Sequence, residues 1–460
     1  MMKKDIRYIS MSVAVAAFAL VGCSHFQEDN LFDENAALRV THFNENLKSR
    51  LVAQSTDGNN GWVIQYFVAG SDEQTFEGFN LLGGFYENGK VTLASNHRFL
   101  RNGKANTYTE STSFYEMLQE EGPVLAFNIW NDVLTVFVDP VDPSSAPASL
   151  ISDGEGMRGD QNLVFQGFEG NNILFRGQRN SSTVRFLPCD RPWKQYIADT
   201  EATRNYITNS AISSYYVICG SDTLYFKDLR SGIITYCERV NDPLFPSTIN
   251  CVFSPTGFYL QHKNKIGETS FQEFTLAPDK TCLVSENDSV QVIATWDNYI
   301  INHSDVWELD ATLFTEEQQN LFNEIASGVS KLNSKWLLKS IGMGRSTGKN
   351  AVNGLIITYY TDKAQAEKNP DKAKTNNAGL QLTLTRPRAK QIGINCTEEN
   401  VVDNNLSVFT ARGTAVESLM RQFAATLSGT YDMVPNDYFL PTSVRCTPVD
   451  GAGKAFKIGN

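Results

Sequence analysis

The stretch Asn162–Pro188, NLVFQGFEGNNILFRGQRNSSTVRFLP, decides the fold class. Its apolar residues fall in three short runs, Leu163–Phe168, Ile173–Arg176 and Thr183–Leu187, and Gly170-Asn171 separates the first two. Short runs rich in β-branched and aromatic residues, bounded by Gly, Asn and Ser, are typical of strands joined by tight turns. The stretch therefore predicts an antiparallel meander.

The residues before this meander predict one helix and then more hairpins. Asp33 can cap a helix in which apolar residues recur every three or four positions up to Leu51. Asn88-Gly89 lies between two apolar runs, which is a strong hairpin signal. Further strands are predicted over 62–67, Val124–Trp130 and Val133–Val138. One helix followed by hairpins indicates a barrel or sandwich closed by the helix.

The rest of the chain predicts a second β-rich region. Pro188 and Pro192 bracket a boundary, and residues 191–213 suit a connecting helix. Capping boxes at Thr315-x-x-Gln318 and Thr414-x-x-Glu417 begin two later helices among predicted strands. The predicted fold class is mainly β with a few helices (α+β), in two antiparallel β-rich lobes that are barrel- or sandwich-like. Each lobe is expected to pack at least one amphipathic helix.

The predicted division of the chain follows from these patterns. Its parts are a leader over 1–22, a tether over 23–32, an N-terminal lobe over 33–190, the connecting helix over 191–213 and a C-terminal lobe over 214–460. Both lobes show the order helix, tryptophan, strand, hairpins, so the helix before Trp62 is matched with the helix before Trp336. This coarse likeness suggests a duplication, although no residue-level repeat is visible.

The leader predicts where the protein is located. Lys3, Lys4 and Arg7 precede an apolar run from Met11 to Val21, and Gly22 stands directly before Cys23. This is the form of a secretory signal peptide, and the run is too short to span a bilayer. Leu20-Val21-Gly22-Cys23 looks like a bacterial lipobox, so Cys23 is predicted to be diacylated after the leader is removed. The alternative is an ordinary signal peptide with an incidental cysteine.

Composition excludes one class of partner. Without the leader, Lys+Arg falls from 40 to 37 and Asp+Glu from 51 to 50, so the net charge moves from −11 to −13. An acidic protein repels phosphate backbones, so we expect no nucleic-acid partner. No later run is apolar for the length that a transmembrane helix needs.

The sequence predicts no catalytic residue, no cofactor site and no metal site. Seven cysteines besides Cys23 form no C-x-x-C pair, and their odd number leaves at least one thiol free or paired between chains. Their expected role is that of small buried apolar side chains. The five histidines show no helical ligand spacing.

Two motifs could each be either a functional site or an ordinary structural loop. Gly344-Arg345-Ser346-Thr347-Gly348 fits the G-x-S-x-G pattern of esterases, but a strand is predicted after it, where a nucleophile elbow needs a helix. A hairpin loop is the preferred interpretation. The 139–160 loop contains Asp139, Asp142, Asp153, Glu155 and Asp160, which could hold calcium, but it lacks the spacing of a calcium loop. A solvated loop is preferred there.

Several stretches together resemble a known family. They are LFDENAALR, NNGWVIQYF, FYENGKVTLAS, GPVLAFNIWN, LTVFVDP and GMRGDQNLVFQGFEGNNILFRGQRNSSTVRFLP, which lie within residues 31–190. The succession resembles the Bacteroidetes lipoprotein family known as domain of unknown function 4302. Where that family would show a Gly-Gly-Asp turn, this chain has Gly156-Met157-Arg158-Gly159-Asp160. The resemblance implies an outer-membrane lipoprotein, often encoded beside TonB-dependent receptors and their lipoprotein partners.

These features lead to one expected function and two alternatives. We expect a lipid-anchored outer-membrane protein, facing the cell surface, that is not an enzyme and binds a nutrient or a partner receptor. The alternatives are a hydrolase acting on glycans or peptides and a structural or adhesive surface protein. A concave aromatic pocket would favour binding, and two facing carboxylates would favour a glycosidase.

Overall fold

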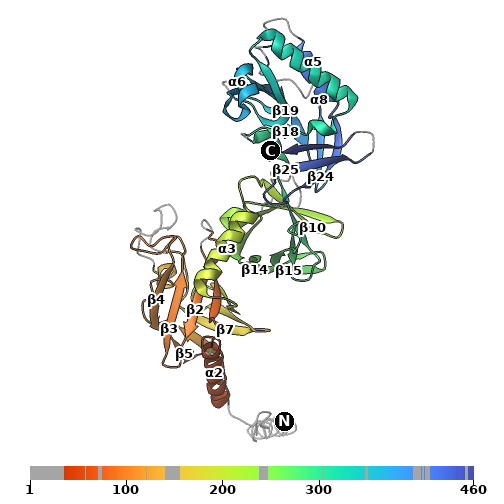
Figure 1. Ribbon diagram of the computed structural model, residues 1–460. Helices are drawn as coiled ribbons and strands as arrows, with labels where there is room; N and C mark the ends of the chain where they lie inside the picture. Colours follow the sequence, from red (N-terminus) through yellow and green to blue (C-terminus); the bar gives the residue numbers. More distant parts are fainter. Residues whose placement is uncertain are drawn as a thin grey trace, which may run out of the picture.

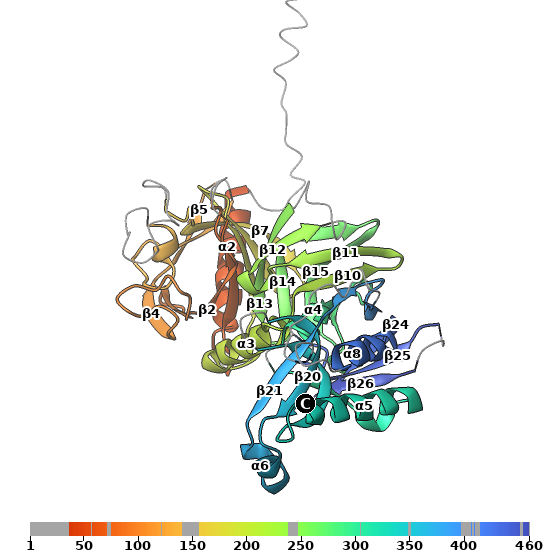
Figure 2. The same ribbon diagram turned by 90° about the horizontal axis from the view of Figure 1, so that it is seen from above.

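Three antiparallel sheets make up the protein, and the chain is mainly β with a few helices, as the sequence predicts. The computed structural model describes residues 36–56, 58–70, 75–120, 122–139, 156–237, 247–303, 305–347, 351–396, 406, 409, 415–450 and 454–459. The sheets are a nine-stranded sheet, a closed barrel and a second nine-stranded sheet. Figures 1 and 2 show that the barrel lies between the other two.

The N-terminal sheet has the strand order β4-β3-β2-β1-β9-β8-β7-β6-β5. Its strands are β1 (Trp62–Phe67), β2 (Phe79–Phe85), β3 (Lys90–Ser95), β4 (Thr109–Phe114), β5 (Glu116–Gln119), β6 (Pro123–Ala126), β7 (Asn162–Glu169), β8 (Asn172–Gly177) and β9 (Thr183–Pro188). Helix α2 (Ala36–Ala53) packs against it, and the buried Trp62 donates from Nε1 to the Leu51 carbonyl at 3.0 Å. The predicted meander and the predicted leading helix are therefore confirmed.

One predicted strand in this lobe is wrong. Residues 133–138 contain a 3₁₀ turn, η1 (Thr135–Phe137), in place of a strand. The Asn131 Oδ1 atom accepts from the Val133 N–H at 3.0 Å, and the Thr135 hydroxyl accepts from the Asn131 N–H at 2.9 Å. These local bonds satisfy backbone groups that a strand would pair with a neighbour, and they override the β-branched composition.

Helix α3 (Trp193–Ile207) connects the N-terminal sheet to the barrel. Tyr196 and Ile197 pack on Val63, Leu82 and Ala94 of the N-terminal sheet. The helix also packs against barrel strands β13 and β14. The predicted connecting helix is thus part of the packing of both units.

The barrel closes because β10 pairs with both its sequence neighbour and the last strand, β17. Its strands are β10 (Ser214–Cys219), β11 (Asp222–Lys227), β12 (Ile233–Cys237), β13 (Ser247–Ser254), β14 (Gly257–Ile266), β15 (Thr269–Leu276), β16 (Leu283–Ser285) and β17 (Gln291–Thr295), with η3 (Leu229–Ser231) between β11 and β12. Alternate residues such as Val217, Phe226 and Phe274 are fully buried, so side chains fill the interior.

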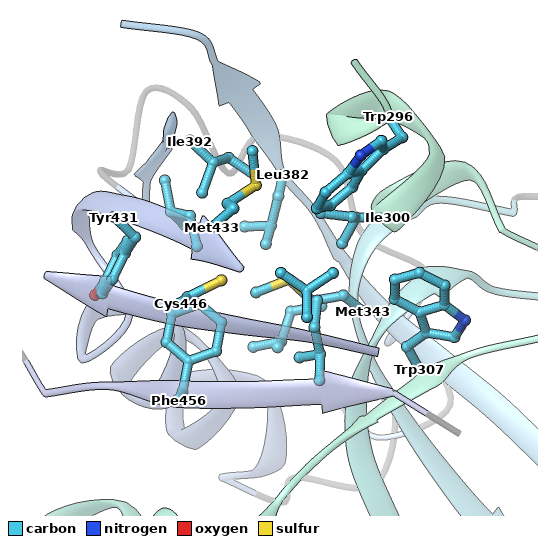
Figure 3. Packing of buried hydrophobic residues seen from close by; sticks show 14 of the residues in the cluster. Trp296, Ile300, Trp307, Met343, Leu382, Ile392, Tyr431, Met433, Cys446 and Phe456 are labelled. Carbon is cyan, nitrogen blue, oxygen red and sulfur yellow. The ribbon is translucent and has the colours of Figure 1, made fainter. Parts of the chain in front are cut away.

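The C-terminal sheet has the order β21-β20-β19-β18-β26-β25-β24-β23-β22. Its strands are β18 (Trp307–Leu309), β19 (Leu337–Arg345), β20 (Asn353–Tyr360), β21 (Thr375–Gln381), β22 (Thr383–Thr385), β23 (Gln391–Asn395), β24 (Gly429–Pro435), β25 (Ser443–Pro448) and β26 (Phe456–Gly459). The helices are α4 (Asp297–Asn302), η4 (Ala311–Leu313), α5 (Glu316–Leu332), α6 (Lys363–Lys368), η5 (Pro370–Lys372) and α8 (Val416–Ala425). Figure 3 shows the packing beneath this sheet, where Cys446 and Phe456 lie beside Tyr431.

Residues 214–460, predicted as one lobe, hold two of the three sheets. A single hydrophobic cluster nevertheless includes buried residues of both, from Ile207 to Ile458. A separate cluster fills the N-terminal sheet. Whether the chain divides into separate lobes at 33–190 and 214–460 remains a prediction.

The two nine-stranded sheets repeat the same strand order, offset by 17 strands. In that order β1 corresponds to β18, so Trp62 corresponds to Trp307, and both tryptophans are buried. The match of Trp62 with Trp336 is therefore wrong, because Trp336 precedes β19, the counterpart of β2. The helices that precede the matched tryptophans are α2 and α4.

The packing of α3 predicts how fragments of the N-terminal lobe behave. A fragment 24–190 would expose Val63, Leu82 and Ala94, which α3 covers in the whole chain. We expect its free energy of unfolding to be at least about 3 kcal/mol lower than that of a fragment 24–209, because burying one large apolar side chain contributes about 1.5–3 kcal/mol. Urea unfolding of the two fragments measures the difference. Equal midpoints would contradict the assignment of α3 to this core, and failure of both to fold would mean that the lobes share one core.

Candidate functional site

An open groove on the N-terminal sheet gathers three aromatic side chains, and we call it the aromatic groove. Its volume is about 420 Å³. It is lined by Ser55, Asn59, Asn60, Gly61, Gly84, Tyr86, Tyr108, Glu110, Pro192, Trp193 and Lys194. These residues come from three parts of the chain: the segment after α2, the strands β2 to β4 and the start of α3.

The strand ends and a helix start place the three rings. Tyr86 directly follows β2, where its N–H donates to the Lys90 carbonyl at 3.0 Å in the β2–β3 hairpin. Tyr108 precedes β4, and Trp193 is the first residue of α3 after Pro192. Pro192 is the residue that precedes the helix, and its ring fixes φ at −55°, which restricts how the chain enters α3 at Trp193.

Hydrogen bonds hold two of the rings in place. The Trp193 Nε1–H donates to the Asn60 carbonyl at 2.6 Å, and the Tyr108 hydroxyl donates to Glu110 Oε1 at 2.5 Å. The Lys194 Nζ atom lies 5.2 Å from the centroid of the Tyr108 ring. Desolvation, and then the hydrogen bond to Glu110, raise the pKa of Tyr108 above its usual value, so this phenol stays protonated at neutral pH.

Gly84 leaves the space between two of the rings free. A Cβ atom at this position would lie 3.4 Å from the Tyr86 hydroxyl and 3.5 Å from the edge of the Trp193 indole. A methyl group would therefore fit in ordinary contact, but a larger side chain would fill the groove. Tyr86 is 40% exposed, so its ring is available to a ligand.

A second concave region lies between the N-terminal sheet, α3 and the barrel, and we call it the junction pocket. Its volume is about 420 Å³. Glu77 forms ion pairs there with Arg98 at 3.4 Å and Arg204 at 3.2 Å, and Arg204 also donates to the Arg230 carbonyl at 2.6 Å. Glu77, Arg204 and Arg230 come from three different units, so this network holds the units together.

His97 lines the junction pocket and is nearly fully buried. Its Nε2 atom lies 2.9 Å from the Val133 carbonyl, to which it donates, and its buried Nδ1 has no hydrogen-bond partner among the described residues. Burial lowers the pKa of His97 to about 4, although the bond to Val133 opposes the shift. A second proton on Nδ1 would be buried without an acceptor, which is why the neutral ring is favoured.

The lowered pKa of His97 predicts a loss of stability in acid. The unfolded chain takes up this proton near pH 6.5 and the folded chain only near pH 4, so the contribution is complete above pH 6.5 and is lost as the pH falls. Between pH 7.5 and pH 4.5 we expect a loss of about 2–3 kcal/mol from this residue. Urea unfolding at both pH values, with His97→Gln as the non-titrating variant, measures it. A loss of equal size in both proteins would contradict the prediction.

The 139–160 loop, for which calcium binding was the alternative to a solvated loop, lies partly outside the described residues, and so do Asp142, Asp153 and Glu155. The two described carboxylates are engaged elsewhere. Asp139 accepts from Arg101 at 2.7 Å, and the buried Asp160 accepts from the backbone N–H groups of Arg179, Asn180 and Ser182 at 2.8, 2.9 and 3.1 Å. In the described part of the chain, no three His, Cys, Asp or Glu side chains gather as a metal site would require.

Ser346 lies in the hairpin between β19 and β20. It is buried, and its hydroxyl accepts from the Val352 N–H at 2.8 Å while its own N–H donates to the Val352 carbonyl at 2.9 Å. The chain passes from strand to strand here, as predicted, whereas a nucleophile elbow passes from strand to helix. Its side chain therefore closes a turn.

The remaining predicted features concern cysteines and the membrane. Cys23, the predicted lipidation site, lies outside the described residues. The described thiols of Cys189, Cys219, Cys251, Cys282, Cys396 and Cys446 are free, and four of them are buried. Among the helices that the structure describes, none is both long enough and apolar enough to cross a bilayer.

Sequence reasoning missed the aromatic groove. The sequence predicts Trp193 only as part of the connecting helix and assigns no role to Tyr86 or Tyr108. No spacing pattern joins positions 86, 108 and 193, because pairing of β2 with β3 and of β3 with β4, and packing of α3 on this sheet, bring them together. The notable signal was the glycine pair Gly83-Gly84 inside a strand, which indicates a close approach of other groups.

The fold and the groove define a class: an antiparallel β protein of three sheets with an open aromatic groove on the first. The chain belongs to the family described as domain of unknown function (DUF4302), whose sequence model matches residues 28–278. Every residue of the aromatic groove and all of the first sheet lie within the matched part.

Comparison with other proteins adds little. No curated protein sequence matches the chain. Among solved structures, Caulobacter crescentus pol III beta shows 9% identity over 90% of this chain and 95% of that chain, with a TM-score of 0.12. The H. pylori beta clamp in complex with 5-chloroisatin shows 10% identity over 91% and 97%, with a TM-score of 0.10. Similarity at these TM-scores bears on neither fold nor function.

Proposed function

We propose that this protein is a Bacteroidetes outer-membrane lipoprotein, anchored at the cell surface through Cys23, that binds a nutrient molecule in the aromatic groove. It acts as a non-enzymatic accessory protein beside a TonB-dependent receptor or the lipoprotein partners of such a receptor. The lipobox-like stretch Leu20-Val21-Gly22-Cys23 supports the anchor. The aromatic groove supports the binding role.

The groove supports the proposal because Tyr86 is accessible and hydrogen bonds hold Tyr108 and Trp193 in place beside it. Tyr86 is exposed, and it lies beside the half-buried Tyr108 and Trp193, so three rings gather in one concave region. Binding sites commonly combine such apolar faces with a few polar groups that fix the orientation of the ligand. Glu110, Lys194 and Asn59 supply these polar groups.

The lining of the groove favours binding over hydrolysis. A glycosidase brings two carboxyl groups to opposite sides of the bond that it cleaves. The groove lining contains one, Glu110, which accepts the hydrogen bond from Tyr108. A single carboxylate that is already hydrogen-bonded is suited to holding a ligand.

The identity of co-purifying molecules tests the proposal. The lipidated full chain is solubilised from its own membrane in two forms, the natural protein and a Tyr86→Ala/Trp193→Ala variant. We expect a small molecule or polymer fragment to accompany the natural protein and to be depleted from the variant. Equal recovery of every bound molecule from the two proteins would overturn the assignment of the groove.

A further inference from the structure

The aromatic groove combines apolar ring faces with hydrogen-bonding groups along their edges, and this combination indicates a ligand class. We infer that the groove binds a neutral saccharide, with sugar ring faces against Tyr86 and Trp193 and hydroxyl groups toward Glu110 and Lys194. This inference rests on the proposed function and deepens it by naming the ligand.

The ring faces match the apolar side of a sugar. A pyranose exposes a face of C–H groups, while its hydroxyl groups point outward along the rim. Tyr and Trp provide large flat apolar faces and lose little side-chain entropy on binding because each has only two side-chain torsions. The Trp193 indole is also held by its bond to the Asn60 carbonyl, so little further ordering is required.

The polar groups match the rim of a sugar. Hydroxyl groups both donate and accept, so they pair equally well with a carboxylate, an ammonium group and a side-chain amide. The groove lining presents all three kinds of group, in Glu110, Lys194 and the amides of Asn59 and Asn60. The Tyr108 hydroxyl already donates to Glu110, which leaves further lone pairs of that carboxylate for a ligand.

The balance of charge favours a neutral ligand. Glu110 and Lys194 are the two charged side chains of the lining, and their charges are opposite. A strongly anionic ligand would meet Glu110, and a cationic ligand would meet Lys194, so neither gains a net attraction. A purely apolar ligand would need an enclosed pocket, whereas this groove is open and its lining is about as polar as it is apolar.

Substitutions at Gly84 and Tyr86 change the groove, and matched controls elsewhere show whether a loss of binding comes from the groove or from damage to the fold. Gly84→Leu places its side chain between Tyr86 and Trp193 and should block the groove. Tyr86→Ala removes one exposed ring face. The matched controls are Phe114→Ala, another exposed aromatic residue at 45% exposure on the same sheet, and Gly122→Leu, where no atom lies within 4 Å of an added Cβ.

The experiment is calorimetric titration of the mature chain with neutral malto-, cello- and xylo-oligosaccharides, and with uncharged tripeptides as the competing class. We expect at least one saccharide series to bind and the peptides not to bind. Tyr86→Ala should weaken saccharide binding about three- to tenfold, in line with the contribution of one aromatic contact. Gly84→Leu should abolish it, and Phe114→Ala and Gly122→Leu should leave it unchanged. Thermal unfolding of every variant shows whether the fold is intact.

The outcomes show separately whether the inferred ligand class is wrong and whether the inferred binding site is wrong. If no saccharide binds but the peptides bind and lose affinity in Tyr86→Ala, the groove remains a binding site and the saccharide inference falls. If saccharides bind equally to Tyr86→Ala, Gly84→Leu and the controls, they bind elsewhere, and the inference and the role of the groove both fall. If neither class binds the natural protein, the saccharide inference is overturned, and the co-purification experiment decides whether the groove binds another ligand.

Discussion

Replacing Cys23 with Ala should move the protein from the membrane fraction to the soluble fraction. The thiol of Cys23 is the predicted site of diacylation, and an alanine offers no sulfur to modify. Each buried methylene group of an acyl chain contributes about 0.8 kcal/mol of membrane affinity, and two chains are sufficient for stable anchoring. We therefore expect the membrane-bound fraction to fall at least about tenfold on loss of both chains.

Fractionation of cells that express the two proteins measures this effect. Cys219→Ala is the matched control, because Cys219 is a free, half-buried cysteine of the barrel that is far from the leader in the sequence. Its partition should equal that of the natural protein. If Cys23→Ala stays with the membrane as strongly as before, the anchor is not a lipid on Cys23, and the proposed localisation loses its basis.

Replacing Asp160 with Ala should be among the most destabilising single substitutions in the N-terminal sheet. Its buried carboxylate accepts three backbone N–H groups, from Arg179, Asn180 and Ser182, in the turn between β8 and β9. Leaving one buried donor unsatisfied costs about 1–3 kcal/mol, so the loss should exceed about 3 kcal/mol. Tyr66 also bonds to the Asp160 backbone, with its hydroxyl 2.7 Å from the carbonyl oxygen, so the turn is tied to β1.

Gly177 provides an independent test of the same network. A Cβ at Gly177 would lie 1.9 Å from the Asp160 Oδ2 atom, so Gly177→Ala must displace the carboxylate. We expect Gly177→Ala to destabilise the protein as well, and the double variant to lose less than the sum of the two single losses, because both act on one set of bonds. Urea unfolding measures these values, with the exposed Glu268→Ala as the charge-matched control. Additive losses, or a loss in Asp160→Ala no larger than in the control, would contradict this role.

Local signals in the sequence were sufficient to predict many of the helices, strands and turns. Asn88-Gly89 predicted the β2–β3 hairpin, and Gly89 adopts the positive φ of 77° that such a turn requires. The predicted capping box at Thr315 and Gln318 forms with both of its hydrogen bonds. These features depend on residues that are adjacent in the chain, which is why a single sequence was enough to predict them.

Features that depend on distant partners were not predictable in this way. Closure of the barrel rests on pairing of β10 with β17, in which Ser214 lies opposite Thr295. No property of either strand alone specifies that partner. The aromatic groove has the same origin, because the position of Trp193 over Gly84 depends on how α3 packs and not on the residues that flank either position.

The repeated strand order allows equivalent positions of the two nine-stranded sheets to be compared. Pairing of Trp62 with Gly83 and of Trp307 with Met343 makes Gly344 the counterpart of Gly84. An added Cβ at Gly344 would meet the Val306 backbone at 3.0 Å and the His303 carbonyl at 3.1 Å, so this position is covered by the chain itself. The first sheet thus keeps an open surface at this position, while the third sheet is covered there by its own backbone. A larger side chain should therefore be tolerated at Gly84 more readily than at Gly344, where it would displace the backbone.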